Sequence, residues 1–82
     1  MINIIFVKEE NRAIAYDDNI EIGECTFEEK NNEWNIIHTG VNNKYQGQGI
    51  ARRLVESIIE NAKVYNKNLE ATCSYAKKVL NK

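Results

Sequence analysis

Residues 45–51 read Tyr45-Gln46-Gly47-Gln48-Gly49-Ile50-Ala51, and they separate a strand-like segment, 34–41, from a helix-like pattern that begins at Gln48. Two glycines one residue apart allow a tight turn and close approach of a ligand to the backbone. The first turn of a helix has amide groups without intrahelical partners, and the positive end of the helix dipole lies there, so it attracts phosphate. The stretch therefore predicts a loop that binds a phosphorylated cofactor.

The composition of the 82-residue chain predicts one globular domain, residues 1–82. Hydrophobic residues make up 43%, which argues against disorder, and a net charge of −1 provides no field that would attract nucleic acid or an anionic membrane. No apolar run is long enough to cross a membrane, and no secretory signal is present. We therefore expect a soluble, cytoplasmic protein. Two cysteines are too few for a disulfide scaffold, so we expect reduced thiols. A monomer or a weak homodimer is expected.

Four segments in the first half of the chain have the alternation or the β-branched and aromatic content of strands: 2–7, 12–17, 20–27 and 34–41. Gly23 marks a weak point or a bulge in the third of them. The polar run 28–33 is expected to be a solvated loop. Because the turns between these strands are short, the sequence predicts an antiparallel meander.

The second half of the chain changes to a helical period. Apolar residues recur every four positions, at Ile50, Leu54, Ile58 and Ala62. They predict an amphipathic helix from Gln48 to about Tyr65. A fifth strand is expected at 69–73, followed by a last helix from Tyr75 to about Leu80 with Ser74 as its N-cap.

The expected fold is therefore α/β (α+β), with the order ββββαβα. An antiparallel meander is followed by one right-handed parallel crossover. The loop at 45–51 then follows the carboxyl end of the fourth strand, and Cys73 lies at the carboxyl end of the fifth. Since open α/β sheets bind ligands at that edge, both features are expected at one site.

Two common phosphate loops do not fit the stretch. A nucleoside triphosphatase loop needs a lysine followed by serine or threonine after its last glycine, but Ile50-Ala51 follow Gly49. A dinucleotide loop needs three glycines and an acidic residue at the end of the next strand, but that strand ends in Thr72-Cys73.

Residues 46–51 instead resemble the acetyl-coenzyme A signature of the GNAT N-acetyltransferases, which is Gln or Arg, two residues, Gly, one residue, then Gly or Ala. In this family the backbone amides of the loop hold the pyrophosphate of the cofactor. Arginines in a first helical turn oppose the dipole unless an anion is bound, which adds Arg52 to the site. The resemblance thus implies acetyl-CoA as the cofactor, with these loop residues in contact: Tyr45, Gln46, Gly47, Gln48, Gly49, Ile50, Ala51 and Arg52.

The segments 37–41 and 73–75 extend the resemblance to a compact, single-domain (YjdJ-like) GNAT subfamily. It implies that the main chain from Thr39 to Val41 pairs with the pantetheine arm and that the Val41 amide faces the thioester carbonyl. It also implies that Cys73 is catalytic, although a free cysteine is more often a small buried hydrophobe. Cys25 is expected to be a packing residue.

Two further catalytic candidates are weaker. Tyr75 is the nearest match to the tyrosine acid that GNAT enzymes carry on the last helix. His38 is either a structural histidine or a general base. The function implied is acetyl-CoA-dependent transfer of acetyl to an unidentified amine. In one variant of this reaction Cys73 takes the acetyl group first, as a covalent intermediate. The alternatives are a coenzyme A-binding module without activity and a small interaction domain.

Overall fold

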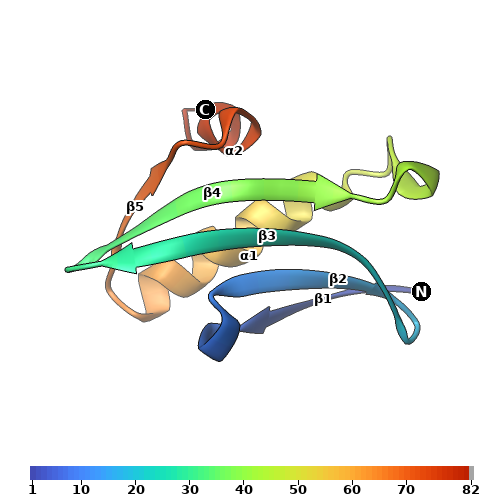
Figure 1. The fold of residues 1–82 in the computed structure, drawn as a ribbon, viewed down its shortest axis with the longest axis horizontal. Helices are drawn as coiled ribbons and strands as arrows, with labels where there is room; N and C mark the ends of the chain where they lie inside the picture. Colours follow the sequence, from blue (N-terminus) through green and yellow to red (C-terminus); the bar gives the residue numbers. More distant parts are fainter. Residues whose placement is uncertain (82) are drawn as a thin grey trace.

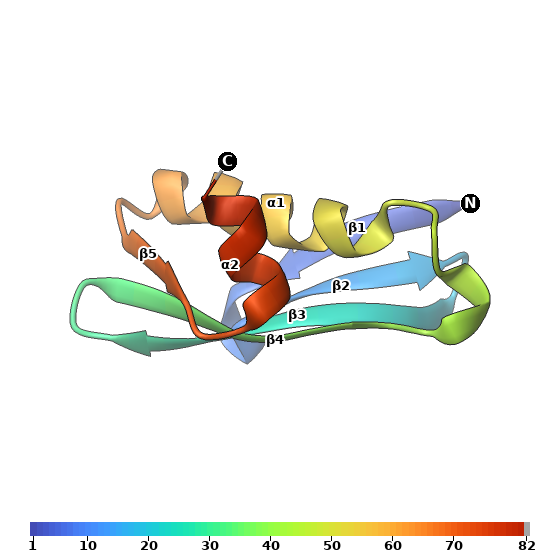
Figure 2. The ribbon, with the colours of Figure 1, turned by 90° about the horizontal axis from the view of Figure 1, so that it is seen from above.

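The computed structural model describes residues 1–81 and shows one sheet with both α-helices on the same face (Figure 1, Figure 2). In chain order the elements are β1 (Ile2–Val7), the 3-10 helix η1 (Lys8–Glu10), β2 (Arg12–Asp17), β3 (Ile20–Lys30), β4 (Glu33–Val41), the 3-10 helix η2 (Asn43–Tyr45), α1 (Ile50–Val64), β5 (Asn68–Ala71) and α2 (Ser74–Leu80). The strand order is β1-β2-β3-β4-β5, antiparallel except for the parallel β4–β5 pair. The predicted order and meander are confirmed. Within residues 1–81 no helix could cross a membrane.

The core lies between α1 and the helix-facing side of the sheet. The predicted apolar stripe of α1, which is Ile50, Leu54, Ile58 and Ala62, is buried, and so is Val55 beside it. Opposite it, Phe27 and Trp34 stack with their ring centroids 4.3 Å apart. Both were expected at strand positions, and the stack joins β3 to β4 beneath the helix.

The expected solvated loop at 28–33 is wrong. β3 continues to Lys30 and β4 begins at Glu33, so only two residues turn the chain, and Asn31 has a φ of 57°. Asparagine tolerates this left-handed conformation, which suits a two-residue hairpin turn. Glu29 is kept in the strand by ion pairs with Lys8 at 3.1 Å and Lys67 at 2.9 Å.

Three element boundaries also differ from the expected ones. α1 begins at Ile50 rather than Gln48, because Gly49 at its N-cap has a φ of 76° and cannot continue a right-handed helix. β5 ends at Ala71. Cys73 therefore lies beyond the strand, at the N-cap position of α2, and Ser74 is the first residue of that helix rather than its cap.

Two bulges change which side chains face the helices. In β2–β3, Ala15 pairs with Gly23 and Tyr16 with Glu21, so Ile22 is the extra residue beside the predicted weak point. In β3–β4, Thr26 pairs with His38 and Phe27 with Ile36, so Ile37 is the extra residue. Side chains alternate along a strand, and one extra residue reverses which of them face the core.

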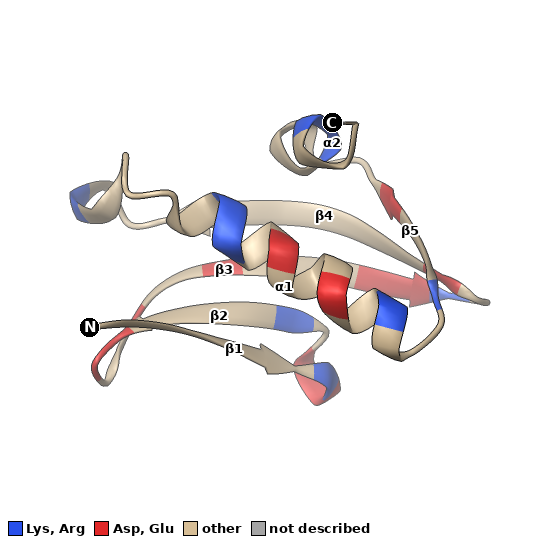
Figure 3. Ribbon diagram, turned by 180° about the vertical axis from the view of Figure 1, so that it is seen from behind, with Lys and Arg blue, Asp and Glu red and all other residues tan. Residues whose placement is uncertain are grey.

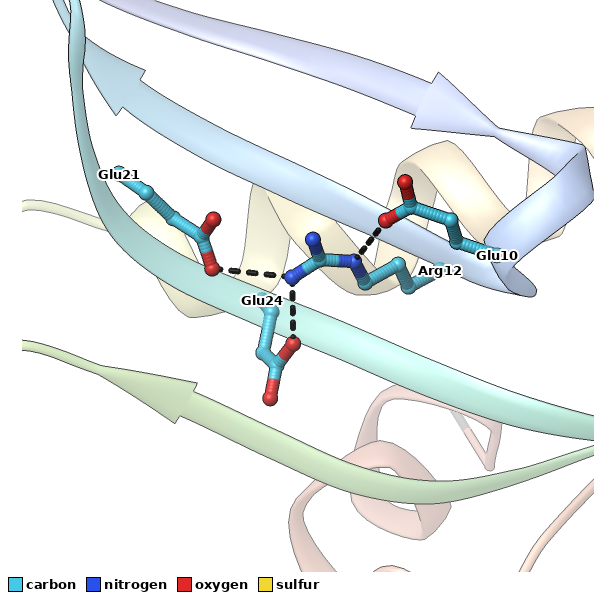
Figure 4. A network of polar contacts seen from close by, with 4 residues as sticks. All are labelled: Glu10, Arg12, Glu21 and Glu24. Atoms are coloured by element: carbon cyan, nitrogen blue, oxygen red, sulfur yellow. Dashed lines mark hydrogen bonds and ion pairs between the residues drawn. The ribbon is translucent and has the colours of Figure 1, made fainter.

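The sheet face away from the helices carries a charged cluster (Figure 4). Arg12 donates to Glu10 at 2.7 Å, Glu21 at 2.9 Å and Glu24 at 2.8 Å. These partners come from η1 and β3, so one guanidinium ties three consecutive elements together. Ile14, two residues along β2 from Arg12, is only 2% exposed.

Candidate active site

The site forms where β4 and β5 part. Their parallel pairing runs only from Glu33 with Asn68 to Ile36 with Ala71. Beyond it the amides of Thr72 and Cys73 both donate to the Ile36 carbonyl, at 3.0 and 3.1 Å, and the chain turns into α2. Within residues 1–81, β4 therefore continues without a neighbouring strand on that side.

The main chain of β4 presents hydrogen-bond donors at this free edge. The Asn42 amide donates to the Ile22 carbonyl at 2.7 Å, toward β3. Because successive amides along a strand point to alternate sides, those of Val41 and Thr39 point away from β3. The two amides that the sequence assigned to the cofactor thus lie on the free side of the strand.

The glycine loop needs glycine for its backbone conformation rather than for space. Gly47 has a φ of 81° and Gly49 a φ of 76°, and a Cβ at either position would meet no atom within 4 Å. The first intrahelical bond of α1 runs from the Arg53 amide to the Gly49 carbonyl at 3.2 Å. The amides just before Arg53 therefore have no helical partner, and no acidic residue occupies this first turn.

A hollow of about 240 Å³ lies in front of these amides. It is lined by Val41, Tyr45, Gln46, Gly47, Gly49, Ile50, Ala51 and Tyr75. Tyr75 comes from α2 and is 38% exposed, while Val41 ends β4. The hollow therefore joins three separate parts of the chain that the sequence had assigned to one site.

Two loop side chains hold the loop in place. Gln46 Nε2 donates to the Val41 carbonyl at 3.0 Å, which ties the loop to the end of β4. The Tyr45 hydroxyl donates to Asp17 Oδ2 at 2.6 Å, and this bond raises the pKa of Tyr45 and lowers that of Asp17. Gln48 is exposed.

The arginines at the start of α1 differ in their surroundings. Arg52 forms an ion pair with Glu56, one turn later, at 3.1 Å. Arg53 is exposed and makes no ion pair with the residues that the structure describes. Figure 3 shows basic residues at the first turn of α1, then acidic ones, and a further basic residue near the end of the helix, which is Lys63. An anion at the first turn would therefore meet positive charge.

Cys73 lies within a row of polar side chains on the helix face of the sheet. Its thiol donates to Thr39 Oγ1 at 3.6 Å, and Thr39 Oγ1 donates to Cys25 Sγ at 3.4 Å. Burial tends to raise the pKa of Cys73, but hydrogen bonds from the Ala76 amide and the Thr39 hydroxyl oppose it. With the amides of Tyr75 and Thr39, these donors bring the pKa of Cys73 below its usual value.

Cys25 is fully buried, as expected for a packing residue, and burial raises its pKa to about 11. Its contact with Thr39 was not anticipated from the sequence. Cys25 and Thr39 are direct partners across β3 and β4, but that register depends on the bulge at Ile37. No spacing in the sequence marks that bulge, so no signal could have joined Cys25 to Cys73.

His38 is not brought together with Cys73 and Tyr75. It follows the bulge and precedes Thr39, so its side chain lies on the opposite face of β4 from the Thr39 hydroxyl. Its ring covers Gly40, where a Cβ would lie 3.0 Å from His38 Nε2. The predicted catalytic residues therefore lie on two sides of β4: Cys73 and Tyr75 on the side of the helices, and His38 on the opposite face.

A second hollow, of about 360 Å³, lies at the β4–β5 pair. It is lined by Glu28, Lys30, Glu33, Asn35, Glu70, Ala71 and Thr72. Cys73 stands in the chain between Thr72, which lines this hollow, and Tyr75, which lines the first. The described part of the chain holds no group of acidic, histidine and cysteine side chains arranged to bind a metal ion.

Comparison with known proteins places this arrangement in a family. A family model described as GCN5-related N-acetyl-transferase matches residues 12–82. Among solved structures, a GCN5-like protein from Staphylococcus aureus is 36% identical with a TM-score of 0.73, and the match covers 96% of this chain and 78% of that one. No match was found among curated proteins.

Two other similar structures contain coenzyme A or an analogue. The NatC complex bound to Gag peptide and CoA is 31% identical over 71% of this chain and 43% of that one, with a TM-score of 0.59. Arabidopsis thaliana Naa50 with the bisubstrate analogue CoA-Ac-MVNAL is 26% identical over 78% and 45%, with a TM-score of 0.56. This chain spans less than half of either protein. The family model and the Staphylococcus aureus structure show that the chain belongs to the GCN5-related N-acetyltransferase (GNAT) family.

Proposed function

We propose that residues 1–82 form a single N-acetyltransferase domain that transfers the acetyl group of acetyl-CoA to an amine. The observation that carries this proposal is the hollow between the glycine loop, Tyr75 and the free edge of β4. Amides without helical partners lie at one end of it, and the amides of Thr39 and Val41 lie along that edge. A ligand with a pyrophosphate and an extended amide chain matches both sets of donors.

In this proposal the loop amides bind the pyrophosphate, and Arg53 adds positive charge beside them. The pantetheine arm extends along β4 as an added strand and pairs with Thr39 and Val41. The Val41 amide donates to the thioester carbonyl, and this bond strengthens as the oxygen becomes an oxyanion. The coenzyme A bound by NatC and the analogue bound by Naa50 support this choice of cofactor.

Acetyl transfer then follows one of two routes. In the direct route the neutral amine attacks the carbonyl carbon, the C–S bond breaks, Tyr75 protonates the leaving thiolate, and a water takes the amine proton. In the second route the Cys73 thiolate attacks the carbonyl carbon, the C–S bond to CoA breaks, and Tyr75 protonates the leaving CoA thiolate. The amine then attacks the acetyl-Cys73 thioester, Cys73 leaves as a thiolate, and a water takes the amine proton. The position of Cys73 beside Thr39 and the lowered pKa of its thiol favour the second route. His38 lies on the other face of β4, so neither route uses it in direct contact with Cys73 or Tyr75.

A thermal shift tests the cofactor site. CoA and acetyl-CoA should raise the Tm of the wild-type protein, because a ligand selective for the folded state stabilises it. Gly49→Glu should abolish this shift by adding a negative charge and a side chain in front of the loop amides. The matched control is Val64→Glu, which adds the same charge at the other end of α1, where the side chain is 76% exposed. An undiminished shift with Gly49→Glu would contradict the assignment of the glycine loop to the pyrophosphate of the cofactor.

Intact-mass measurement separates the two routes. Wild-type protein mixed with acetyl-CoA should gain the mass of one acetyl group, and Cys73→Ala should not. Addition of an amine should remove this mass. The panel of amines should include diamines, because three glutamates and one lysine line the second hollow beside Thr72. If no adduct forms but amines are acetylated, the direct route operates. If acetyl-CoA binds and no amine is acetylated, the protein is a coenzyme A-binding module.

A further inference from the structure

The row of Cys25, Thr39 and Cys73 joins three elements through one hydroxyl group. Thr39 Oγ1 lies 3.4 Å from Cys25 Sγ and 3.6 Å from Cys73 Sγ, and the three residues come from β3, β4 and the N-cap of α2. A hydroxyl carries one hydrogen and two lone pairs, so it can donate to only one of the two sulfurs at a time. The direction of donation in this row must therefore depend on the protonation of the thiols.

In the structure the row runs from Cys73 through Thr39 to Cys25. A Cys73 thiolate has no hydrogen to donate and needs donors instead. The Thr39 hydroxyl can turn toward it only by leaving Cys25, and Cys25 can then donate its own S–H hydrogen to Thr39 Oγ1. In the reversed row the hydrogens of the Thr39 hydroxyl and of the Cys25 thiol both form hydrogen bonds, provided that Cys25 keeps its proton.

The surroundings of Cys25 meet that condition. Its side chain is fully buried, and burial raises its pKa to about 11. The negative charges of the Cys73 thiolate and of Glu24 add to this increase. Cys25 therefore remains a thiol at a pH where Cys73, with its lowered pKa, ionises.

We propose that Thr39 and Cys25 are positioning residues for the Cys73 thiolate: the Thr39 hydroxyl reverses its hydrogen bond to stabilise the ionised sulfur, and Cys25 donates to Thr39 from behind. The inference rests on the proposed role of Cys73 in acetyl transfer. The only covalent bond that breaks in this step is the S–H bond of Cys73, whose proton goes to solvent; every other change is in hydrogen bonds. Cys25, which the sequence assigned only to packing, thus helps to prepare Cys73 as the nucleophile.

The groups that face the Cys73 thiol are few. From α2 it receives the amides of Tyr75 and Ala76, and from β4 it receives the amide and the hydroxyl of Thr39. From β3, Cys25 bonds to Thr39, and the charge of Glu24 raises the pKa of Cys25. Since the largest causes that lower the pKa of Cys73 are hydrogen bonds, removal of one donor should be measurable.

The test is the pH dependence of alkylation of Cys73 by iodoacetamide, measured without acetyl-CoA and with the modified residue identified by mass spectrometry. Thr39→Val keeps the side-chain shape and removes the hydroxyl. We expect its alkylation at pH 7 to slow by about tenfold, which corresponds to the loss of one hydrogen bond to a charged group. The midpoint of its pH profile should move upward, and rates at a pH where Cys73 is fully ionised should match the wild type. Thr39→Ser restores the hydroxyl and should restore the profile.

Cys25→Ala supplies a second measurement, because it leaves Thr39 intact and removes the donor behind it. We expect its midpoint to lie between those of the wild type and Thr39→Val. An unchanged midpoint in Cys25→Ala would overturn the role of Cys25, and an unchanged midpoint in Thr39→Val would overturn the proposal as a whole. If Thr39→Val does not fold, Cys25→Ala decides alone. A negative result here with an intact CoA thermal shift would leave the cofactor site standing, so the two failures can be told apart.

Discussion

Glu29 shows how one carboxylate can hold the end of a strand in place. It accepts hydrogen bonds from Lys67 and Lys8, which come from the segment after α1 and from η1. These bonds lower its pKa to about 2, against 4.5 for an unperturbed glutamate. Because the pKa in the folded state is the lower one, the ionised form stabilises the fold. This stabilisation is fully present above about pH 4.5 and is lost as the pH falls toward 2.

Glu29→Gln should therefore lower the free energy of unfolding at pH 7, and the difference from the wild type should shrink as the pH falls from about 4.5 toward 2. Urea unfolding at several pH values in this range measures it. The control is Glu28→Gln, because the neighbouring carboxylate makes no ion pair with the described residues. A difference that is constant with pH would show that the ion pairs of Glu29 do not stabilise the fold through its charge.

Residue by residue, the sequence predicted the glycine loop and the core stripe but not the contacts between distant side chains. Gly47 and Gly49 have the positive φ that their type suggests, and Trp34 and Phe27 are buried. The partners of Glu29 could not be predicted, because a charged strand end looks like a loop until the folded chain brings two lysines to it. The contact between Tyr45 and Asp17 is of the same kind.

At the scale of elements, periodicity predicted helix α1 and the meander because both depend on local sequence. The bulge at Ile37 could not be predicted, and it decides which side of β4 carries Thr39 and which carries His38. The end of β5 was also misplaced, since a strand of four residues leaves little alternation to read. Errors of one or two residues at these points move catalytic candidates from one face of a strand to the other.

Arg12 provides the test of how elements are joined on the open face of the sheet. Arg12→Met keeps an aliphatic chain and removes the bonds to Glu10, Glu21 and Glu24, which then repel one another. Because the guanidinium is partly exposed, we expect a loss of only about 1 kcal/mol in the free energy of unfolding. Urea unfolding measures this loss, and it should decrease at about 1 M salt as the charges are screened. Lys63→Met, at an exposed position of α1, is the control and should cost less. Equal losses for both variants would argue against the network.

At the scale of the whole molecule, α1 and α2 cover one face of the sheet (Figure 2), and the hollow beside Val41 lies next to them at the end of β4. If the pantetheine arm adds to that edge, saturating CoA should slow hydrogen exchange of the Val41 amide by about tenfold or more, and that of the Thr39 amide, which already donates to Cys73, by less. Exchange measured by NMR with and without CoA resolves these two positions. Gly49→Glu is the matched control and should show no slowing. Protection confined to the first turn of α1 would mean that the arm leaves the strand edge free.

The short β4–β5 pairing also divides the molecule by the order in which its parts unfold. The four strands of the meander pair along most of their length, whereas β5 has four residues and α2 seven. We expect β5 and α2 to open as a small cooperative unit, at a lower free energy than the meander with α1. The hollow lies on the boundary between these units, with Tyr75 on one side and the glycine loop on the other. A bound cofactor would join them, so occupancy of the hollow would be measurable as increased order in the last segment of the chain.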